Sequence, residues 1–272
     1  MTGVYETEPT GVHEVEGPGA AAPGDPQLSS HATHFTLPCD GEVLSCVTVR
    51  PVIPAPAPLA VLVLHGAGNG DKQSPAVLAA AFADRGHHAL AFDFSGHGDS
   101  TGTLGGLSLR RRFEQARTVV DTCLPTDAPL VLVGFSMSGQ TVADLAAHYR
   151  NRLAAIGLGA PAVYAAQAWP VAFDAGFTGI IRTPDSWRKS PALDVFRELP
   201  EGVRAVLATP AVDAVIPPAV TEAVDEALGA SRAEYVRVVL PEADHRLSLW
   251  FASEAKAREG FVDVLLGGGG RV

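Results

Sequence analysis

The chain has 272 residues, 47% of them hydrophobic, which is enough to bury the core of one large α/β domain or of two small ones. Its net charge of −10, without a long basic stripe, argues against a nucleic-acid partner. No apolar run approaches the roughly 20 residues of a membrane span, and the N-terminus lacks a secretory signal pattern. The three cysteines lack metal-ligand spacing. We therefore expect a reduced cytoplasmic protein without membrane contact or metal.

The first part of the chain differs in composition from the rest. Residues 1–30 contain five acidic residues, no lysine or arginine, and no hydrophobic periodicity, which predicts a disordered acidic leader. The β-rich runs His34–Cys39 and Val43–Arg50 then flank the turn signal Asp40-Gly41, which predicts an antiparallel hairpin. We therefore expect one domain over residues 31–272.

Strand and helix patterns alternate after this hairpin. Strands are expected at Leu59–Leu64, His88–Phe94, Leu130–Val133, Ala154–Gly159, Val203–Thr209 and Tyr235–Leu240. Helices are expected at Ser74–Arg85 (with a serine cap), Ser108–Leu124, Gln140–Tyr149 and Pro218–Leu228, and a last one within Leu247–Leu265. This alternation predicts a mostly parallel sheet covered by helices on both faces, with ligands at the carboxyl ends of its strands.

The alternation is interrupted between Pro161 and Pro200, which predicts a small helical insertion, or cap, at about 161–200. This segment contains six aromatic residues, Tyr164, Trp169, Phe173, Phe177, Trp187 and Phe196. Two interpretations are open, because aromatic rings dominate burial wherever they occur. The rings either pack the insertion onto the core, or some of them line an apolar substrate pocket.

A sharp turn with a serine at its tip follows one of the buried strands. The sequence Gly134-Phe135-Ser136-Met137-Ser138-Gly139 comes directly after the apolar run Pro129–Val133. It is typical of a nucleophile elbow, in which the turn exposes the serine hydroxyl at the start of a helix. Alternatively, Ser136 is an ordinary turn serine that satisfies a helix N-terminus.

An acid and a histidine, the residue types that a nucleophilic serine needs, follow Ser136 along the chain. Asp213 and His245 each come just after a predicted strand, as Ser136 does. A serine hydroxyl needs an imidazole to accept its proton, and the imidazole needs a carboxylate to orient it. The rival acids are Asp194, which does not follow a strand, and Asp244, which adjoins His245 and cannot easily point at it.

With these motifs in order, the chain resembles an α/β-hydrolase from about residue 33 to its end. The loop His65-Gly66-Ala67-Gly68-Asn69 is similar to the His-Gly loop of that family. The resemblance implies that the backbone N–H groups of Ala67 and Met137 form an oxyanion hole and that His65 has a structural role. It also implies that Asp93 and His97, in Asp93-Phe94-Ser95-Gly96-His97-Gly98, shape a turn after the next strand.

One position departs from the family pattern, and one charged run has no role in it. The usual elbow is Gly-x-Ser-x-Gly, whereas Ser138 stands at the last position here, so we expect a working elbow with tighter packing. The run Arg110-Arg111-Arg112 is interpreted as a solvated helix face, or alternatively as a docking patch for an acidic partner such as an acyl carrier domain.

The predicted activity is hydrolysis of a carboxylic ester or thioester through an acyl-enzyme, with Ser136, His245 and Asp213 as the catalytic triad and with no cofactor. The expected partner is a small-molecule acyl substrate, free or carrier-bound, and the sequence does not indicate an oligomeric state. Acyl transfer or cyclisation by the same triad stays open, as does a non-hydrolytic ligand-binding member of the fold. Pocket candidates are Tyr164, Trp169, Phe173, Phe177 and Trp187.

Overall fold

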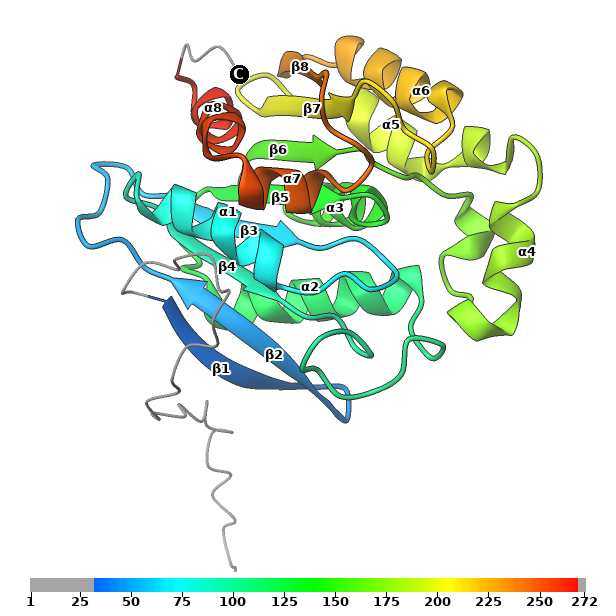
Figure 1. Ribbon diagram of the computed structural model, residues 1–272, viewed down its shortest axis with the longest axis horizontal. Coiled ribbons are helices and arrows are strands. Elements are labelled where there is room, and N and C mark those ends of the chain that lie inside the picture. Colours follow the sequence, from blue (N-terminus) through cyan, green and yellow to red (C-terminus); the bar gives the residue numbers. More distant parts are fainter. Residues whose placement is uncertain (1–31, 269–272) are drawn as a thin grey trace, which may run out of the picture.

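The computed structural model describes residues 32–268, and eight strands in this range form one sheet. The strands are β1 (Ala32–Cys39), β2 (Glu42–Val49), β3 (Ala60–Leu64), β4 (His88–Phe92), β5 (Leu130–Phe135), β6 (Leu153–Gly159), β7 (Arg204–Pro210) and β8 (Glu234–Leu240). Their order across the sheet is β1-β2-β4-β3-β5-β6-β7-β8 (Figure 1). The predicted leader, residues 1–30, lies outside the described residues.

The sheet is mostly parallel, as the alternating sequence pattern predicts. β1 pairs antiparallel with β2, β2 pairs antiparallel with β4, and every other pairing is parallel. In the hairpin between β1 and β2, Asp40 and Gly41 both have positive φ values, +52° and +77°. A two-residue hairpin turn of this kind requires positive φ at both positions, which is why Asp-Gly is a reliable signal.

Helices cover both faces of the sheet, which confirms the predicted α/β fold. They are α1 (Gln73–Ala83), α2 (Leu109–Cys123), α3 (Ser138–His148), α4 (Thr178–Ile181), α5 (Pro191–Arg197), α6 (Pro218–Gly229), α7 (Leu247–Ser253) and α8 (Ala255–Leu265). One face packs against α1, α7 and α8, and the other packs against α2, α3, α5 and α6. Ligand sites are therefore expected at the rim where the parallel strands end.

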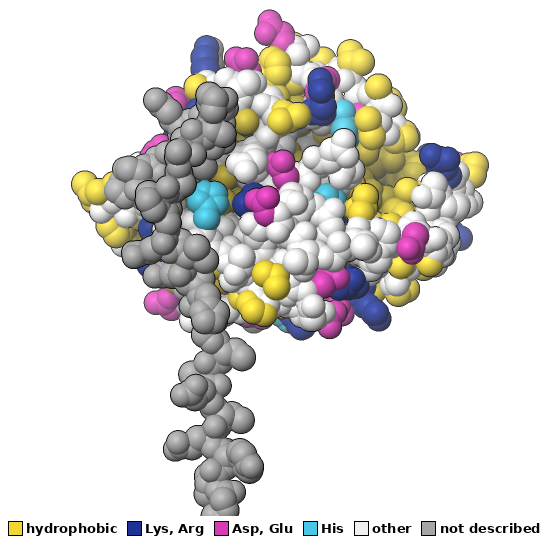
Figure 2. Space-filling model, turned by 60° about the horizontal axis from the view of Figure 1, so that its bottom comes forward, with side chains coloured by type: hydrophobic (Ala, Val, Ile, Leu, Met, Phe, Trp, Pro, Cys, Tyr) yellow, Lys and Arg dark blue, Asp and Glu magenta, His cyan; other side chains and the backbone are white. Residues whose placement is uncertain are grey.

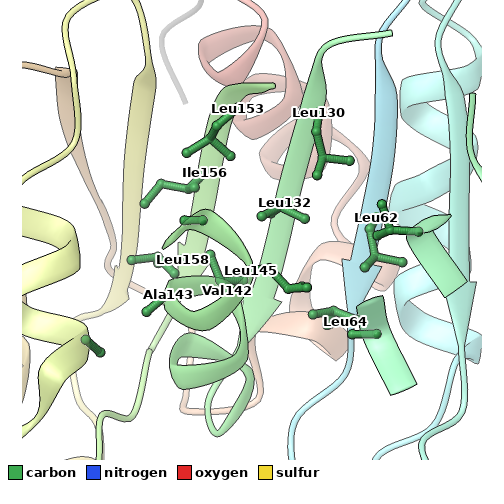
Figure 3. Close-up of a cluster of buried hydrophobic side chains, with 14 of the residues drawn as sticks. Leu62, Leu64, Leu130, Leu132, Val142, Ala143, Leu145, Leu153, Ile156 and Leu158 are labelled. Atoms are coloured by element: carbon green, nitrogen blue, oxygen red, sulfur yellow. The ribbon is translucent and has the colours of Figure 1, made fainter. Parts of the chain in front are cut away.

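The core under α3 shows how the layers are joined (Figure 3). Leu132 of β5 and Ile156 of β6 are fully buried and point toward this helix, and Leu62 of β3 is equally buried in the same core. Val142 and Leu145 of α3 are equally buried and pack onto them. Burial of a side chain of this size contributes roughly 1.5–3 kcal/mol, so these contacts fix α3, and with it the turn that precedes it.

Two helices differ from their predicted form. The predicted serine cap of the first helix is wrong, because α1 begins at Gln73 and its N-cap is Lys72. The Asp71 carboxylate accepts a hydrogen bond from the Gln73 N–H and the Asp93 carboxylate accepts one from the Lys72 N–H, so the helix begins before Ser74.

The last predicted helix is two helices, α7 and α8, which meet at Glu254. Phe251 of α7 stacks on Phe261 of α8 with ring centroids 4.7 Å apart. Ten residues of one continuous helix would separate them by about 15 Å, so the break allows both rings to enter the same core.

Between β6 and β7 the chain forms short helices and turns. Besides α4 and α5, short 3-10 helices occur at Ala166–Ala168 and Ser186–Lys189, and a π-helical turn occurs at Phe173–Phe177. In Figure 1, α4 projects to the right of the sheet, beyond the arrowheads of the strands. None of the helices within residues 32–268 is long and apolar enough to cross a membrane.

Candidate active site

Ser136 lies on a strained turn between β5 and α3. Its φ is +50°, in the left-handed region that L-residues with side chains seldom adopt. The turn is held on both sides, because the Ser136 N–H donates to the Gly159 carbonyl (2.9 Å) and the Ala162 N–H donates to the Ser136 carbonyl (2.8 Å). A Cβ at Gly134 would lie 2.7 Å from the Ser138 carbonyl oxygen, so only glycine fits there.

Three side chains from separate loops form a continuous hydrogen-bonded chain. His245 Nε2 lies 3.0 Å from Ser136 Oγ, and His245 Nδ1 lies 2.9 Å from Asp213 Oδ2. The other Asp213 oxygen accepts hydrogen bonds of 2.8 Å from the Val215 and Ile216 N–H groups, which fix the carboxylate. An imidazole that donates from Nδ1 to Asp213 presents an unprotonated Nε2 to the serine hydroxyl.

The two rival acids pair with arginines and not with His245. Asp194 forms an ion pair with Arg197 at 2.8 Å, and Asp244 forms one with Arg246 at 2.7 Å. Hydrogen bonds from Arg246 lower the pKa of the Asp244 carboxyl, and this group is exposed. The structure therefore brings Asp213, and neither of these acids, to His245.

The predicted oxyanion donors, Ala67 and Met137, both line one cavity with Ser136. Neither backbone N–H has a hydrogen-bond partner among the described residues. The loop that carries Ala67 passes close to the serine, since a Cβ at Gly66 would lie 3.2 Å from the Ser136 Cβ. Two free N–H groups beside a serine hydroxyl can donate hydrogen bonds to a developing oxyanion.

His65 orients one of these donors. Its Nδ1–H donates to the Gly66 carbonyl (2.7 Å), and its Nε2 accepts from the Phe94 N–H (3.1 Å). The Gly66 carbonyl and the Ala67 N–H belong to one planar peptide and point in opposite directions, so fixing the first aims the second. Burial, helped by the positive charge of Arg112, holds the pKa of His65 well below its usual range, which keeps the ring neutral in this tautomer.

Asp93 is a buried hydrogen-bond acceptor that stabilises the loop after β4. It is fully buried and accepts hydrogen bonds from the Lys72 ammonium (2.7 Å) and the Asp99 N–H (3.0 Å). Burial alone would lower the pKa of Lys72, but its hydrogen bonds to Asp93 and Asp99 outweigh that effect and raise it. His97 is buried beside this loop, with Nδ1 3.1 Å from the Ser95 carbonyl. Both residues lie where the predicted turn requires them.

Two cavities flank Ser136. The first, of about 350 Å³, is named here the Trp187 cavity and is lined by Ala67, Ser136, Met137, Ala162, Val163, Tyr164, Ile181, Ser186, Trp187, Val215, Ile216, Pro217 and Val220. The second, of about 290 Å³, is named the His245 cavity and is lined by His65, Gly66, Ala67, Asn69, Gly70, Asp71, Ser74, Phe135, Ser136, His245, Arg246, Leu247, Ser248 and Leu249. On the right of Figure 2, hydrophobic side chains gather around a hollow in the surface.

The aromatic residues of segment 161–200 divide into two groups. Tyr164 and Trp187 line the Trp187 cavity, as the pocket interpretation requires. Trp169, Phe173 and Phe177 do not line either cavity. Trp169 Nε1 donates to Asp144 Oδ2 (2.9 Å), and the Phe173 and Phe177 rings pack on each other 4.7 Å apart. Phe196 is fully buried in the core.

The interpretation of Arg110-Arg111-Arg112 as a solvated face is wrong for its last residue. Arg112 is fully buried, and its guanidinium lies 3.7 Å from the centre of the Phe94 ring. Its Nη2 donates to the His65 carbonyl (2.9 Å) and to Ser138 Oγ (2.7 Å). Helical spacing could have predicted this burial. Arg112 follows Leu109 by three residues and precedes Ala116 by four, so all three lie on the buried face of α2.

Several solved structures are similar to this chain. A thioesterase domain from the curacin biosynthetic pathway has a TM-score of 0.62 at 17% identity, covering 85% of this chain and 99% of its own. Est1E from Butyrivibrio proteoclasticus, with ferulic acid bound, has a TM-score of 0.64 at 17% identity with the same coverage. Carboxylesterase CesB from Bacillus subtilis has 0.61 at 14%, covering 89% and 94%. At these identities, the similarity establishes the fold and not the activity.

Sequence comparison gives a narrower result. No curated protein sequence matches the chain. A family model described as serine aminopeptidase, S33, matches residues 55–190, a range that includes the His65 loop and the Ser136 turn. Since this match spans half of the chain and the sheet has the order and direction described above, the chain belongs to the serine aminopeptidase S33 family of α/β-hydrolases.

Proposed function

We propose that the protein hydrolyses a carboxylic ester or thioester through an acyl-enzyme intermediate. The observation that carries this proposal is the chain Asp213–His245–Ser136, with contacts of 2.9 and 3.0 Å, at a serine held with φ of +50°. His245 accepts the hydroxyl proton as Ser136 attacks the carbonyl carbon, and then returns it to the leaving group. Asp213 keeps the imidazole in the required tautomer and stabilises its cation.

The Ala67 and Met137 N–H groups are the proposed oxyanion donors. Both lack a partner among the described residues, so no existing hydrogen bond has to be broken when they bind the oxyanion. A donor of this kind is typically worth about 3 kcal/mol in the transition state. Water then enters as the second nucleophile, activated by His245, and releases the acid.

The two cavities suggest how the substrate is divided across Ser136. His245 must reach the leaving atom, and it lines only the His245 cavity, whereas Met137 lines only the Trp187 cavity. We therefore assign the leaving group to the His245 cavity and the acyl group to the Trp187 cavity. The described residues that line the Trp187 cavity include no carboxylate, so an acyl group with a free α-ammonium would lack a partner there.

The similar structures support this choice of substrate class without fixing it. One is a thioesterase domain, one is an esterase with bound ferulic acid, and one is a carboxylesterase. The Trp187 cavity, with Tyr164 and Trp187 in its wall, fits an uncharged apolar or aromatic acyl group of moderate size.

Labelling with a fluorophosphonate tests the nucleophile. We expect the protein to bind one equivalent of label at Ser136, and the Ser136→Ala variant to bind none and to lose ester turnover. Ser45→Ala is the control, because this serine lies within β2 and not on the turn after β5, so its loss should leave labelling unchanged. Equal labelling of the parent and Ser136→Ala would refute the assignment.

A substrate panel tests the chemistry. It contains p-nitrophenyl esters of increasing acyl length, an aromatic ester, acyl thioesters of a small thiol and of a carrier-linked pantetheine, and an aminoacyl p-nitroanilide. We expect turnover of the uncharged esters or thioesters with an optimum in acyl length, and poor turnover of the aminoacyl anilide. Adding a nucleophilic alcohol distinguishes hydrolysis from acyl transfer, because only a transferase would form a new ester in preference to the acid.

A further inference from the structure

The residue that departs from the usual elbow glycine occupies a well-defined position. Ser138 is fully buried at the first position of α3, two residues after the proposed nucleophile. Its Oγ–H donates to the His65 carbonyl (2.6 Å) and its oxygen accepts from Arg112 Nη2 (2.7 Å). Arg112 Nη2 donates to the same His65 carbonyl at 2.9 Å. These three groups, named here the elbow clamp, join the elbow, the loop after β3 and helix α2.

The charged side chain of the elbow clamp, Arg112, is costly to bury. Arg112 forms no ion pair with any described residue, and its Nε and Nη1 have no hydrogen-bond partner there. Burial lowers the pKa of Arg112 to about 9. An uncompensated buried cation costs several kcal/mol, and stacking on Phe94 offsets only part of this. A hydrophobic side chain of similar size would serve stability as well or better, which points to a role outside stability.

The elbow clamp acts where the two proposed oxyanion donors meet. The Met137 N–H is one residue before Ser138, and the Ala67 N–H belongs to the peptide group directly after that of the His65 carbonyl. The His65 ring already fixes the Gly66 carbonyl, and the elbow clamp fixes the carbonyl that precedes it. The two loops that supply the donors are thus joined to each other directly, behind Ser136.

We propose that Ser138 and Arg112 are positioning residues that set the distance between the Ala67 and Met137 N–H groups and so align the oxyanion hole. The inference rests on the proposed function, because it has meaning only if these donors stabilise an oxyanion. Neither residue lines either of the two cavities beside Ser136. A misplacement of about 1 Å in a catalytic group can reduce the rate about 100-fold, so loss of the elbow clamp affects the transition state more than substrate binding.

The test compares Ser138→Ala, Arg112→Met and the double variant with a matched control, Thr141→Val. Thr141 lies one turn further along α3, is fully buried, and has an Oγ1 without a hydrogen-bond partner among the described residues. Its substitution therefore removes an equally buried hydroxyl that holds nothing. Turnover is normalised to the sites that react with the fluorophosphonate, and thermal unfolding is recorded for each variant.

We expect Ser138→Ala to lower kcat about 10- to 100-fold with KM unchanged within about twofold. A trifluoromethyl ketone forms a tetrahedral hemiketal with the serine oxygen and places its former carbonyl oxygen in the hole, so it should lose affinity by the same factor. Thr141→Val should match the parent in both measurements. The double variant should lose less than the product of the single losses, because both substitutions remove support from one carbonyl.

The outcomes separate this inference from the proposed function. If Ser136→Ala is inactive and Ser138→Ala retains the parent kcat and ketone affinity, the elbow clamp has no positioning role and the proposed function stands. The positioning role is also overturned if Ser138→Ala raises KM as much as it lowers kcat. It is overturned as well if the lower activity reflects only a smaller fraction of sites that react with the fluorophosphonate. If Ser136→Ala retains turnover, both proposals fail.

Discussion

At the scale of single residues, the contact between Ser136 and His245 depends on where separate strands end. The two residues are 109 positions apart, and Asp213 is 32 positions from His245. Each follows a parallel strand, β5, β7 or β8, and parallel strands of one sheet end at the same rim. Residue order and strand assignment were therefore sufficient to propose all three residues from the sequence.

Asp213→Asn should lower kcat by about four orders of magnitude while leaving the fold intact. An amide at this position can donate to His245 Nδ1 and so favours the wrong tautomer, in which Nε2 carries the proton. The expected result is measured as kcat for an activated ester, with circular dichroism to verify the fold. Asp244→Asn is the control, because that exposed carboxylate faces Arg246 and should be silent. Comparable losses in the two variants would speak against Asp213.

The buried Arg112 shows what residue type alone conceals. Three consecutive arginines suggest solvent, because a buried charge is rare, yet helical spacing places the third among buried side chains. Its partners are the His65 carbonyl and Ser138, which are distant in sequence. Since neither partner is a carboxylate, no complementary charge in the sequence could have indicated the contact.

At the scale of elements, periodic patterns located the strands and the long helices within a few residues. Segment 161–200 was less predictable, because its helices are too short for a 3.6-residue period to emerge. Aromatic content indicated burial there but not its direction, and only Tyr164 and Trp187 face the cavity beside Ser136. The direction of each ring depends on tertiary contacts, such as the hydrogen bond from Trp169 to Asp144 of α3, and no local pattern encodes them.

Helix α3 holds this segment through two side chains. The Gln140 side-chain oxygen accepts from the Tyr164 N–H (3.1 Å) and the Ser190 hydroxyl (3.3 Å), and its nitrogen donates to Asp144 (2.9 Å). Asp144 also accepts from the Trp169 indole N–H (2.9 Å). Both ends of segment 161–200 are thus joined to one turn of α3.

Asp144 should make stability depend on pH in an unusual direction. Burial raises its pKa from 3.8 to about 6, against the opposing hydrogen bonds from Trp169 and Gln140. Between these values the folded state binds more protons than the unfolded state, so stability is fully present below pH 4 and is lost as pH rises through about 6. Relative to Asp144→Asn, the parent should lose about 2 kcal/mol of unfolding free energy from pH 4 to pH 7.

Urea unfolding of the two proteins at several values between pH 4 and pH 7 measures this difference. The other titrating groups contribute to both proteins and cancel in the comparison. Parallel pH curves for the parent and Asp144→Asn would show that the carboxyl titrates normally in the folded protein.

At the scale of the whole molecule, the site is supported from both faces of the sheet. The elbow clamp and α3 lie on the face covered by α2. Phe135 is the last residue of β5 and precedes Ser136. On the other face of the sheet, the centre of its ring lies 6.1 Å from that of Phe251 of α7, which in turn stacks on Phe261 of α8. The two C-terminal helices thus support the same turn that the elbow clamp holds from behind.

Phe251→Ala should lower the free energy of unfolding by about 3–5 kcal/mol, because it leaves a cavity between β5, α7 and α8 that the sheet cannot close. Phe251 is fully buried, whereas Leu249 on the same helix is 53% exposed, so Leu249→Ala is the control and should change stability by less than about 0.5 kcal/mol. Urea unfolding followed by tryptophan fluorescence measures both. Because α7 begins two residues after His245, ester turnover of Phe251→Ala should also fall at temperatures below its unfolding transition. Equal unfolding midpoints for the two variants would show that the stacked rings do not connect the C-terminal helices to the sheet.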